Sequence, residues 1–340
     1  MFEVIISGIQ TSVQDAGRNG FLATGMPVCG AADRLSLALG NLIVLNDPGD
    51  YFIIGKNAGA AGIEILMMGF EIKILKETVF AITGADLSPT LNCKPVPMWE
   101  AIKAEPEDII SFTKMTPGKG IRSYLCFAGG IDVPIWNNSR STYIRGAVGG
   151  YKDRKLEIGD IVPVADPSVN LNRIQGRKLK WYVIPKISPP WQVNVVMGPH
   201  DDMFLEESII LFLETDWVFS QNSDRMGCRF NGPVLKFKPR AAHLAEQAGA
   251  DPSNIIDCPQ IPGAIQNPSG KELAVWHVDG SAMGGYIIIA TIISSDLWML
   301  GQMMPGEKVR FRSVLQRNGA GMLKNFERDV SEKNIERRSD

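Results

Sequence analysis

The 340-residue sequence has little cysteine, little histidine and almost no net charge, and each shortage excludes a class of protein. Its five cysteines are scattered and contain no Cys-x-x-Cys pair, which argues against a disulfide framework and indicates free thiols in a reducing compartment. Its three histidines lie far apart and lack the ligand spacing of a zinc site. Lys and Arg number 35 against 37 Asp and Glu, and this balance argues against a dedicated nucleic-acid-binding protein.

Long apolar runs are also missing. The longest run, from Tyr286 to Ile293, is far shorter than the about 20 residues that a membrane-spanning helix needs. The N-terminal residues carry no basic region followed by a long apolar segment, so we expect no signal peptide. We therefore expect a cytoplasmic protein that does not enter a membrane.

Several common catalytic motifs are absent. There is no G-x-x-x-x-G-K-[ST] phosphate loop, no G-x-G-x-x-G dinucleotide motif, no G-x-S-x-G turn and no H-E-x-x-H zinc motif. There is also no Ala-Met-Lys-Met biotin attachment motif. A cysteine–histidine nucleophilic pair stays open, although no spacing favours it. If the chain takes part in catalysis, any nucleotide or biotin chemistry must come from elsewhere.

Short runs of alternating apolar and polar residues dominate what is present. This period of two is typical of half-buried antiparallel strands, and it is clearest in Phe70–Ile74, Trp191–Val195 and Val309–Arg312. Helical spacing is rarer and is found in Leu35–Ile43, in Leu205–Leu213 and in a short segment from Ser295. The sequence therefore predicts a mainly β protein of closed or nearly closed barrels with a few short helices.

A polar, turn-rich stretch between Val164 and Trp181 is the best candidate for a domain boundary. It predicts an N-terminal domain over residues 1–165 and a C-terminal domain over residues 180–315. Residues 316–340 are dense in charge, which predicts a charged tail that is either a solvated helix or frayed.

Five glycine-containing segments concentrate acidic, guanidinium and carboxamide side chains: residues 10–18, 129–142, 223–227, 262–266 and 279–286. Glycine lets the backbone approach a ligand closely, and arginine can bind a carboxylate through two hydrogen bonds. The alternative for any one segment is that its charges only lock a loop through local ion pairs and Asx turns.

Eight motifs carry a resemblance to a known family, and they occur in this order: Gly8–Arg18, Gly30–Asp33, Ile82–Asp86, Ala128–Pro134, Ser139–Thr142, Ser223–Gly227, Pro262–Gln266 and Gly284–Tyr286. The chain resembles the biotin-dependent carboxyltransferase family, also called the allophanate hydrolase subunit 2 family. This family includes the C subunit of bacterial 5-oxoprolinase, the Kip-type antagonist of a sporulation kinase inhibitor, and a carboxyltransferase subdomain of urea carboxylase. The resemblance extends from about Gly8 to Val314.

The resemblance implies two tandem cyclophilin-like β-barrel domains and a B-type partner, a subunit 1 or Kip inhibitor-like homologue, with an A-type subunit in the oxoprolinase case. It also implies that this chain alone binds no cofactor, and that partner subunits supply ATP or carboxybiotin. Three functions stay open. The first is a subunit of an ATP-dependent amidohydrolase that converts 5-oxoproline to glutamate. The others are a carboxyltransferase subunit of a biotin-dependent urea or amide carboxylase, and a non-catalytic Kip-type regulator.

Motif match and side-chain chemistry together nominate the site residues, and no metal ligand is among them. The expected catalytic residues are Asp279 as acid, base or orienter, Arg225 as an anion-binding group, and Gln266 as an amide donor. The expected substrate-binding residues are Arg18 and Arg140, with Asp15 and Asp224 orienting the arginines. We expect these groups to converge in one cleft that a partner chain completes.

The chain departs from the family pattern in three places. Residues 280–287 lack the Arg, the two Thr and the Pro that similar members usually carry, residues 257–260 differ, and residues 243–254 look like an insertion. Either a divergent substrate or a loss of catalysis would follow. Asp33 could serve the site or begin the helix after it, and Trp136 is expected in a core or an interface rather than around a ligand.

Overall fold

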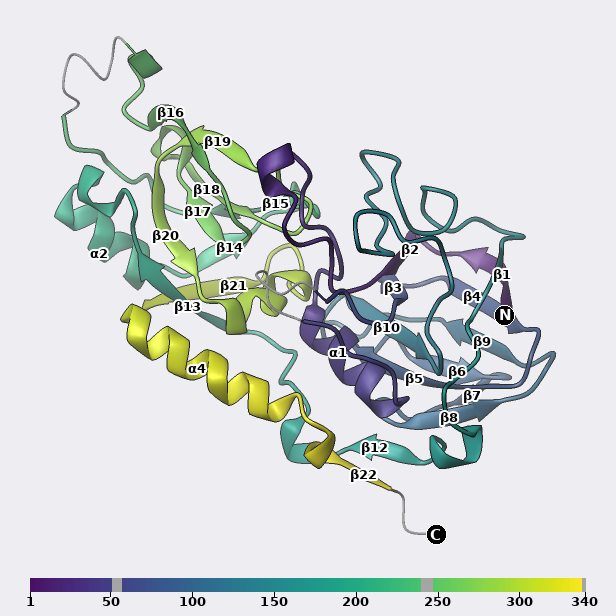
Figure 1. Cartoon of the computed structure of the whole chain (residues 1–340). Coiled ribbons are helices and arrows are strands. Elements are labelled where there is room, and N and C mark those ends of the chain that lie inside the picture. Colours follow the sequence, from purple (N-terminus) through teal and green to yellow (C-terminus); the bar gives the residue numbers. More distant parts are fainter. Residues whose placement is uncertain (51–56, 240–246, 338–340) are drawn as a thin grey trace. The chain divides into compact units, whose positions relative to one another are not determined.

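The computed structural model describes residues 1–50, 57–239 and 247–337, which group into two compact units (Figure 1). Unit 1 contains Met1–Gly20, Cys29–Ile187 and Glu327–Asp340, and unit 2 contains Phe21–Val28 and Ser188–Phe326. The described residues are mostly β, with 33% strand and 19% helix, which confirms the predicted mainly β fold with few helices.

Unit 1 is built from two antiparallel sheets. The six-stranded sheet has the order β11 (Ile161–Val162), β1 (Phe2–Ser7), β4 (Phe70–Ile74), β9 (Ile109–Phe112), β6 (Pro89–Leu91) and β7 (Lys94–Pro95). The five-stranded sheet has the order β2 (Gln10–Gln14), β3 (Gly62–Leu66), β10 (Arg122–Phe127), β5 (Thr78–Gly84) and β8 (Ala101–Ala104). The alternation predicted for Phe70–Ile74 is confirmed in β4.

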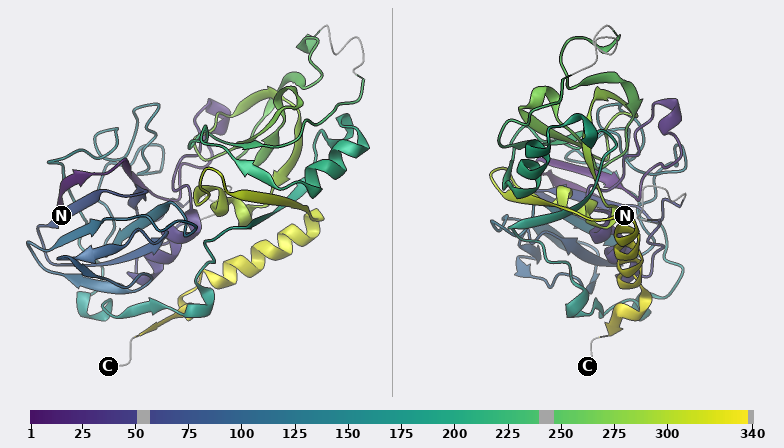
Figure 2. Two further views of the ribbon diagram at one scale, coloured as in Figure 1. Left: turned by 180° about the vertical axis from the view of Figure 1, so that it is seen from behind. Right: turned by 90° about the vertical axis from the view of Figure 1, so that its left-hand side faces the viewer.

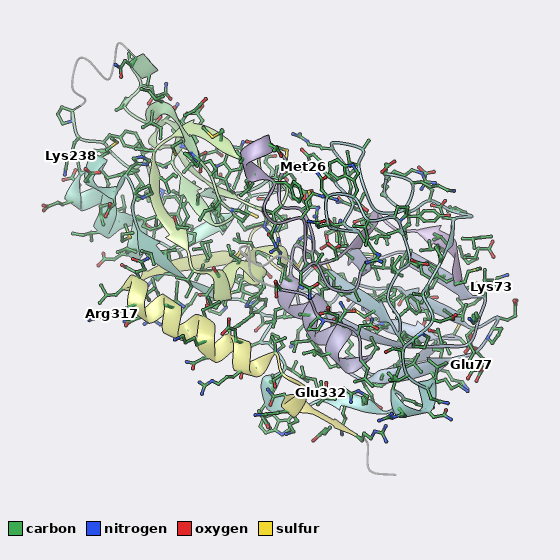
Figure 3. All side chains as sticks on the ribbon, in the orientation of Figure 1. Met26, Lys73, Glu77, Lys238, Arg317 and Glu332 are labelled. Carbon is green, nitrogen blue, oxygen red and sulfur yellow. The ribbon has the colours of Figure 1, made fainter. Side chains whose placement is uncertain are left out.

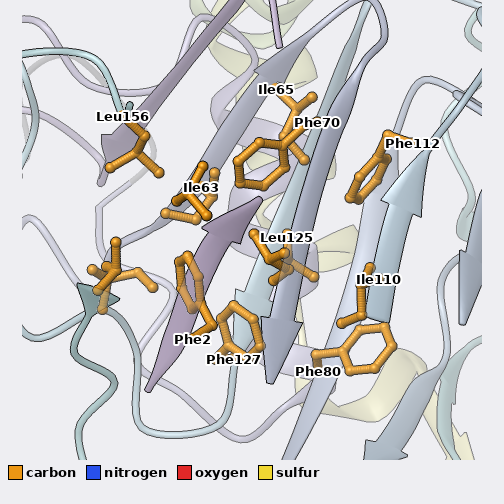
Figure 4. Close-up of a cluster of buried hydrophobic side chains, with 14 of the residues drawn as sticks. Phe2, Ile63, Ile65, Phe70, Phe80, Ile110, Phe112, Leu125, Phe127 and Leu156 are labelled. Carbon is orange, nitrogen blue, oxygen red and sulfur yellow. The ribbon is translucent and has the colours of Figure 1, made fainter. Parts of the chain in front are cut away.

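The core of unit 1 is formed by apolar side chains of both sheets (Figure 4). Phe2 of β1 stacks on Phe127 of β10 with ring centroids 5.3 Å apart, and Phe80 of β5 packs on the same ring. In β4, Phe70 and Ile72 are fully buried because every second side chain of a strand points to the same face. Burial of each such side chain stabilises the unit by about 1.5–3 kcal/mol.

Helix α1 (Arg34–Ile43) packs against β5 and β10, and it confirms the helix predicted over Leu35–Ile43. Asp33 begins it, because the Asp33 carboxylate accepts hydrogen bonds from the Ser36 backbone N–H (2.9 Å) and hydroxyl (2.6 Å). Of the two roles expected for Asp33, the structure shows the one at the start of the helix. Gly40 lets the helix approach the sheet, since a Cβ there would lie 2.7 Å from Cys126 Sγ.

Unit 1 also contains short elements from the middle and from the end of the chain. Strand β12 (Arg177–Leu179) pairs with β22 (Ile335–Arg337), and the 3₁₀ turns η2 (Leu171–Arg173), η3 (Trp181–Val183) and η7 (Glu332–Asn334) flank this pair. Arg177 Nη2 lies 2.6 Å from Glu332 Oε1. The predicted charged tail thus begins as helix α4 (Gln316–Asp329) and continues into a paired strand. The predicted division into domains over residues 1–165 and 180–315 stays a prediction.

Unit 2 contains a closed seven-stranded barrel, seen from two further sides in Figure 2. Its order is β13 (Trp191–Met197), β20 (Ile288–Ile292), β17 (Ala264–Gln266), β18 (Glu272–Trp276), β15 (Gly227–Asn231), β14 (Trp217–Phe219) and β21 (Lys308–Ser313). Phe311 of β21 stacks on Phe212, with ring centroids 5.2 Å apart, and meets Phe230 of β15 edge to face at 5.7 Å. The alternation predicted for Trp191–Val195 and Val309–Arg312 is confirmed in β13 and β21.

Shorter elements surround the barrel. The two-stranded ribbon of β16 (Asn254–Pro259) and β19 (Met283–Tyr286) forms a separate sheet. Helix α2 (Glu206–Glu214) confirms the second predicted helix, whereas the segment from Ser295 lies in a 3₁₀ helix, η6 (Ser294–Gly301). The remaining 3₁₀ turns are η1 (Leu22–Thr24), η4 (Asp201–Met203) and η5 (Pro268–Gly270).

Two further features of the described residues bear on function. In residues 1–50, 57–239 and 247–337, no helix is both long enough and apolar enough to span a membrane. In the same ranges, no three His, Cys, Asp or Glu side chains are grouped so that they could hold a metal ion.

Candidate functional site

The first site cluster lies in unit 1 around Asp15, the residue after β2. Asp15 Oδ1 accepts hydrogen bonds from the Gly17 backbone N–H (2.8 Å) and the Ser139 hydroxyl (2.7 Å), and Oδ2 accepts one from the Arg140 backbone N–H. Ser139 in turn shares a 2.7 Å hydrogen bond with Ser141. Asp15 therefore ties the turn after β2 to a loop that lies 124 positions further along the chain.

Asp15 is completely buried, and this burial raises the pKa of its carboxyl group. The three hydrogen bonds, from Arg140, Ser139 and Gly17, and the charge of Arg18 act in the opposite direction. Because both carboxylate oxygens already accept hydrogen bonds from the protein, Asp15 acts as a positioning group for the loop that carries Arg140.

Arg18 is a buried cation in the same cluster, with 1% of its surface exposed. Its Nη2 donates to the Ser141 carbonyl, and the centre of its guanidinium lies 5.2 Å from the centroid of the Trp136 ring. Its Nε and Nη1 atoms have no hydrogen-bond partner among the described residues. A buried guanidinium with two uncommitted nitrogens is suited to bind an anionic oxygen.

A glycine makes room for this guanidinium. Gly149 has φ +73°, and a Cβ at that position would lie 2.7 Å from Arg18 Nη2 and 2.4 Å from the Ser141 carbonyl oxygen. Any larger residue would therefore displace the arginine, in addition to the backbone strain of a positive φ.

Arg140 is held at its backbone by Asp15, while its side chain points elsewhere in unit 1. Its Nε donates to the Val133 carbonyl at 3.2 Å. Its side chain lines a cavity of about 420 Å³ together with Gly129, Gly130 and Asp132. The structure thus places Arg140 and the two glycines of its own segment, residues 129–142, around one cavity.

The second site cluster lies in unit 2 and consists of Arg225 and Asp279. Arg225 Nε donates to Asp279 Oδ2 at 2.9 Å and Nη2 donates to Oδ1 at 3.0 Å, which is a bidentate ion pair. The Asp279 backbone N–H also donates to the Arg225 carbonyl at 2.8 Å. Both residues are buried, so the pair forms a fixed, water-poor unit.

The turn that carries Asp279 follows β18 and is packed tightly. A Cβ at Gly280 would lie 2.3 Å from the Trp276 ring and 2.9 Å from the Met226 carbonyl oxygen. This close approach leaves no room for a side chain at position 280. His277, also buried, donates its backbone N–H to the Met226 carbonyl at 3.0 Å.

Asp224 is exposed and makes its hydrogen bonds with its own turn. Its Oδ1 accepts from the backbone N–H groups of Met226 (2.8 Å) and Gly227 (3.1 Å). Asp224 therefore shapes the turn after Arg225 and does not contact the guanidinium through these bonds.

Gln266, at the end of β17, packs against the β16–β19 ribbon. Its Nε2 lies 3.5 Å from the Tyr286 carbonyl oxygen. A Cβ at Gly284 would lie 2.7 Å from Gln266 Nε2 and 3.1 Å from Gln260 Nε2. Glycine at this position therefore allows two buried carboxamides to lie side by side.

The predicted site residues fall into two groups. Asp15, Arg18 and Arg140 come together in unit 1, and Arg225 pairs with Asp279 in unit 2, with Asp224 and Gln266 on neighbouring parts of that unit. That the two groups share one cleft stays a prediction.

Sequence reasoning missed two neighbours. It did not connect Trp136 with Arg18, whose guanidinium the Trp136 ring covers, and it did not single out Gln260 beside Gln266. An arginine and a tryptophan that lie so far apart in sequence give no signal of their contact. Gln260 could have been noticed as a carboxamide within a segment that departs from the family pattern.

The fold is that of a carboxyltransferase-type protein. Residues 24–313 match the family model described as "Carboxyltransferase domain, subdomain A and B", and the chain belongs to this family.

Among curated proteins, the chain is 34% identical over 320 residues to urea amidolyase from Lachancea kluyveri, which covers 91% of this chain and 17% of that protein. It is 31% identical over 312 residues to the 5-oxoprolinase C subunit from Escherichia coli K12, which covers 92% of this chain and 90% of that protein. The chain therefore spans about a sixth of the length of the urea amidolyase and most of the length of the Escherichia coli protein.

Solved structures agree with this assignment. The urea carboxylase of Kluyveromyces lactis superposes with a TM-score of 0.86 at 31% identity, covering 98% of this chain and 30% of that one. TTHA0988 superposes with a TM-score of 0.74 at 25% identity, covering 92% of this chain and 55% of that one. The chain is thus homologous to the 5-oxoprolinase C subunit and to the carboxyltransferase region of urea carboxylase.

Proposed function

We propose that this chain is a subunit of an ATP-dependent amidohydrolase that opens 5-oxoproline to glutamate, as its resemblance to the 5-oxoprolinase C subunit suggests. A B-type homologue would complete its active site, and an A-type subunit would join them in a cytoplasmic complex. The cytoplasmic location is supported by its five scattered cysteines, which contain no Cys-x-x-Cys pair.

The observation that carries this proposal is the uncommitted pair of Arg18 nitrogens. 5-Oxoproline carries a carboxylate beside its lactam ring, whereas urea carries none. A buried guanidinium with two nitrogens that lack acceptors can be satisfied by an anion, and a substrate carboxylate supplies one. Arg18 is therefore better matched to 5-oxoproline than to urea.

The other site residues take roles that follow from their contacts. Asp15 holds the loop of Arg140, and Asp279 fixes the orientation of Arg225 through two hydrogen bonds. The Gln266 carboxamide would donate to the carbonyl oxygen as negative charge develops there. ATP, supplied through the partner subunits, would provide the energy to activate a stable lactam.

A carboxyltransferase subunit of a biotin-dependent urea or amide carboxylase is the second candidate. It is supported by the match to the urea carboxylase of Kluyveromyces lactis over 98% of this chain. In that case carboxybiotin would arrive through partner domains, and Arg18 would bind its carboxyl group.

Arg18→Ala tests the assignment of Arg18 to the substrate carboxylate. In the reconstituted complex, we expect the KM for 5-oxoproline to rise at least tenfold, because a charge-assisted hydrogen bond contributes about 1.5–3 kcal/mol. The KM for 2-pyrrolidinone, the same lactam without the carboxylate, should change less than twofold. An equal effect on both lactams would overturn the assignment of Arg18 to the substrate carboxylate.

A further inference from the structure

A second cavity lies in unit 2, and neither Arg225 nor Asp279 lines it. It has a volume of about 480 Å³, and it lies among η4, residues 238–239 and β16. This volume is in the range of small-molecule sites. None of the site residues nominated from the sequence lines it.

Most of the cavity wall is apolar. Five apolar side chains line it: Met203, Pro239, Pro252, Ile255 and Ile256. Ile256 is 62% exposed although it lies within a paired strand, so its side chain is available to a ligand. A wall of this kind favours an aliphatic group of a ligand.

His200 adds a hydrogen-bond donor to the wall. The Ile288 backbone N–H donates to His200 Nδ1 at 3.1 Å, so in the neutral ring the proton is on Nε2. Burial lowers the pKa of His200, against the charges of Asp202 and Asp201, which keeps the ring neutral at physiological pH.

Two opposite charges complete the lining. The Lys238 backbone N–H donates to the Met203 carbonyl at 2.8 Å, which fixes the segment. No carboxylate of the described residues lies within ion-pair distance of the Lys238 ammonium group (Figure 3 labels Lys238). Asp202 lies close enough to His200 to affect its pKa. The cavity thus offers a cation and a donor for a carboxylate, a carboxylate for an ammonium group, and apolar wall for an aliphatic side chain.

We propose that this cavity binds a small aliphatic α-amino acid as a second ligand, separate from the proposed amide substrate. Lys238 and the His200 Nε2–H bind the ligand carboxylate, Asp202 binds its ammonium group, and Met203 with Ile256 contacts its side chain. This inference does not depend on the reaction that the chain supports.

Cys258 provides a direct reporter, because it lines the cavity and is partly exposed. Labelling of the whole chain with iodoacetamide, followed by mass spectrometry, measures the rate at Cys258 and, as an internal control, at the exposed Cys93 of unit 1. We expect millimolar L-leucine to slow labelling of Cys258 at least fivefold without changing the rate at Cys93. Equal rates at Cys258 with and without L-leucine would overturn the proposal.

Calorimetric titration gives a second, label-free measurement. L-Leucine should bind with a saturable isotherm, while 4-methylpentanoate, which lacks the ammonium group, and isoamylamine, which lacks the carboxylate, should each bind at least tenfold more weakly. Equal binding of either fragment would contradict the pairing of both charges.

Matched variants locate the binding. Lys238→Met and Asp202→Asn should each weaken L-leucine at least tenfold, whereas Lys236→Met, an exposed lysine two positions away that does not line the cavity, should leave binding unchanged. Binding that is insensitive to Lys238→Met and Asp202→Asn would place the amino acid elsewhere and refute the site.

Discussion

At the scale of single residues, the site is built from buried charges whose partners come from distant parts of the sequence. Arg225 and Asp279 are 54 positions apart, and Asp15 and Arg140 are 125 apart. The chemical types could be predicted, because glycine-containing segments with Asp, Arg and Gln are unusual. The pairings could not, because an Asp beside an Arg in sequence, such as Asp224, satisfies its own turn instead.

The buried ion pair should be important for stability. Asp279→Asn removes the charge that offsets Arg225, and breaking a buried pair in this way typically costs about 3–5 kcal/mol. Urea denaturation followed by intrinsic fluorescence measures the loss. Asp224→Asn is the control, since its side chain stays an acceptor on an exposed turn, and it should cost less than about 0.5 kcal/mol. Equal midpoints for the two variants would contradict the observed pairing.

Asp160 should make the stability of unit 1 depend on pH in the acid range. It is buried, and burial opposes its ionisation, yet hydrogen bonds from Arg154, the Glu157 backbone and Lys152 lower its pKa from 3.8 to about 2. The ionised form is thus favoured in the folded state. Its contribution of about 2 kcal/mol is complete above pH 3.8 and is lost as the pH falls toward 2.

Urea denaturation between pH 5 and pH 2 measures this effect. Over that interval the free energy of unfolding of the wild-type chain should fall by about 2 kcal/mol more than that of Asp160→Asn, because the variant has no carboxyl group at position 160 to protonate. Parallel curves for the two proteins would show that Asp160 does not cause the acid sensitivity.

At the scale of elements, the sequence predicts regular strands and helices but not the ribbon beside Gln266. Period-two alternation located β4, β13 and β21, and Asp33 marked the start of α1. The β16–β19 ribbon has no such pattern, since β19 contains Gly284 and Gly285 and β16 ends at Pro259. Its register depends on pairing with a strand about 30 residues away, which local composition does not specify.

Packing of α1 on its sheet can be tested at Gly40. Alanine favours an isolated helix by about 1 kcal/mol over glycine, but a Cβ here would lie 2.7 Å from Cys126 Sγ and 3.0 Å from Thr83 Oγ1. We expect Gly40→Ala to destabilise unit 1 by about 1–3 kcal/mol in urea denaturation. Removing the sulfur in a Gly40→Ala/Cys126→Ala double variant should recover part of this loss. A stabilised single variant would show that the helix does not approach β10 so closely.

At the scale of the whole molecule, the predicted mainly β fold and the predicted family are both confirmed. The ordered motifs carried the family prediction, because each alone is weak while their order is specific. The sequence could not show that the last strand, β22, returns to pair with β12, since the charge-dense segment before it is typical of a tail. Nor does the sequence specify the larger assembly, because the relatives occur both as a subunit and as a part of larger enzymes.

The account depends most on the proposal that this chain opens a lactam only together with partner subunits. The most direct measurement is ATP-dependent formation of glutamate from 5-oxoproline by this chain alone, by its B-type and A-type homologues alone, and by all of them together. The account predicts turnover only in the complete mixture. Tight complex formation without turnover would favour a Kip-type regulator, carboxylation of urea by a biotin-dependent mixture would favour the carboxyltransferase, and either result would contradict the proposed hydrolysis.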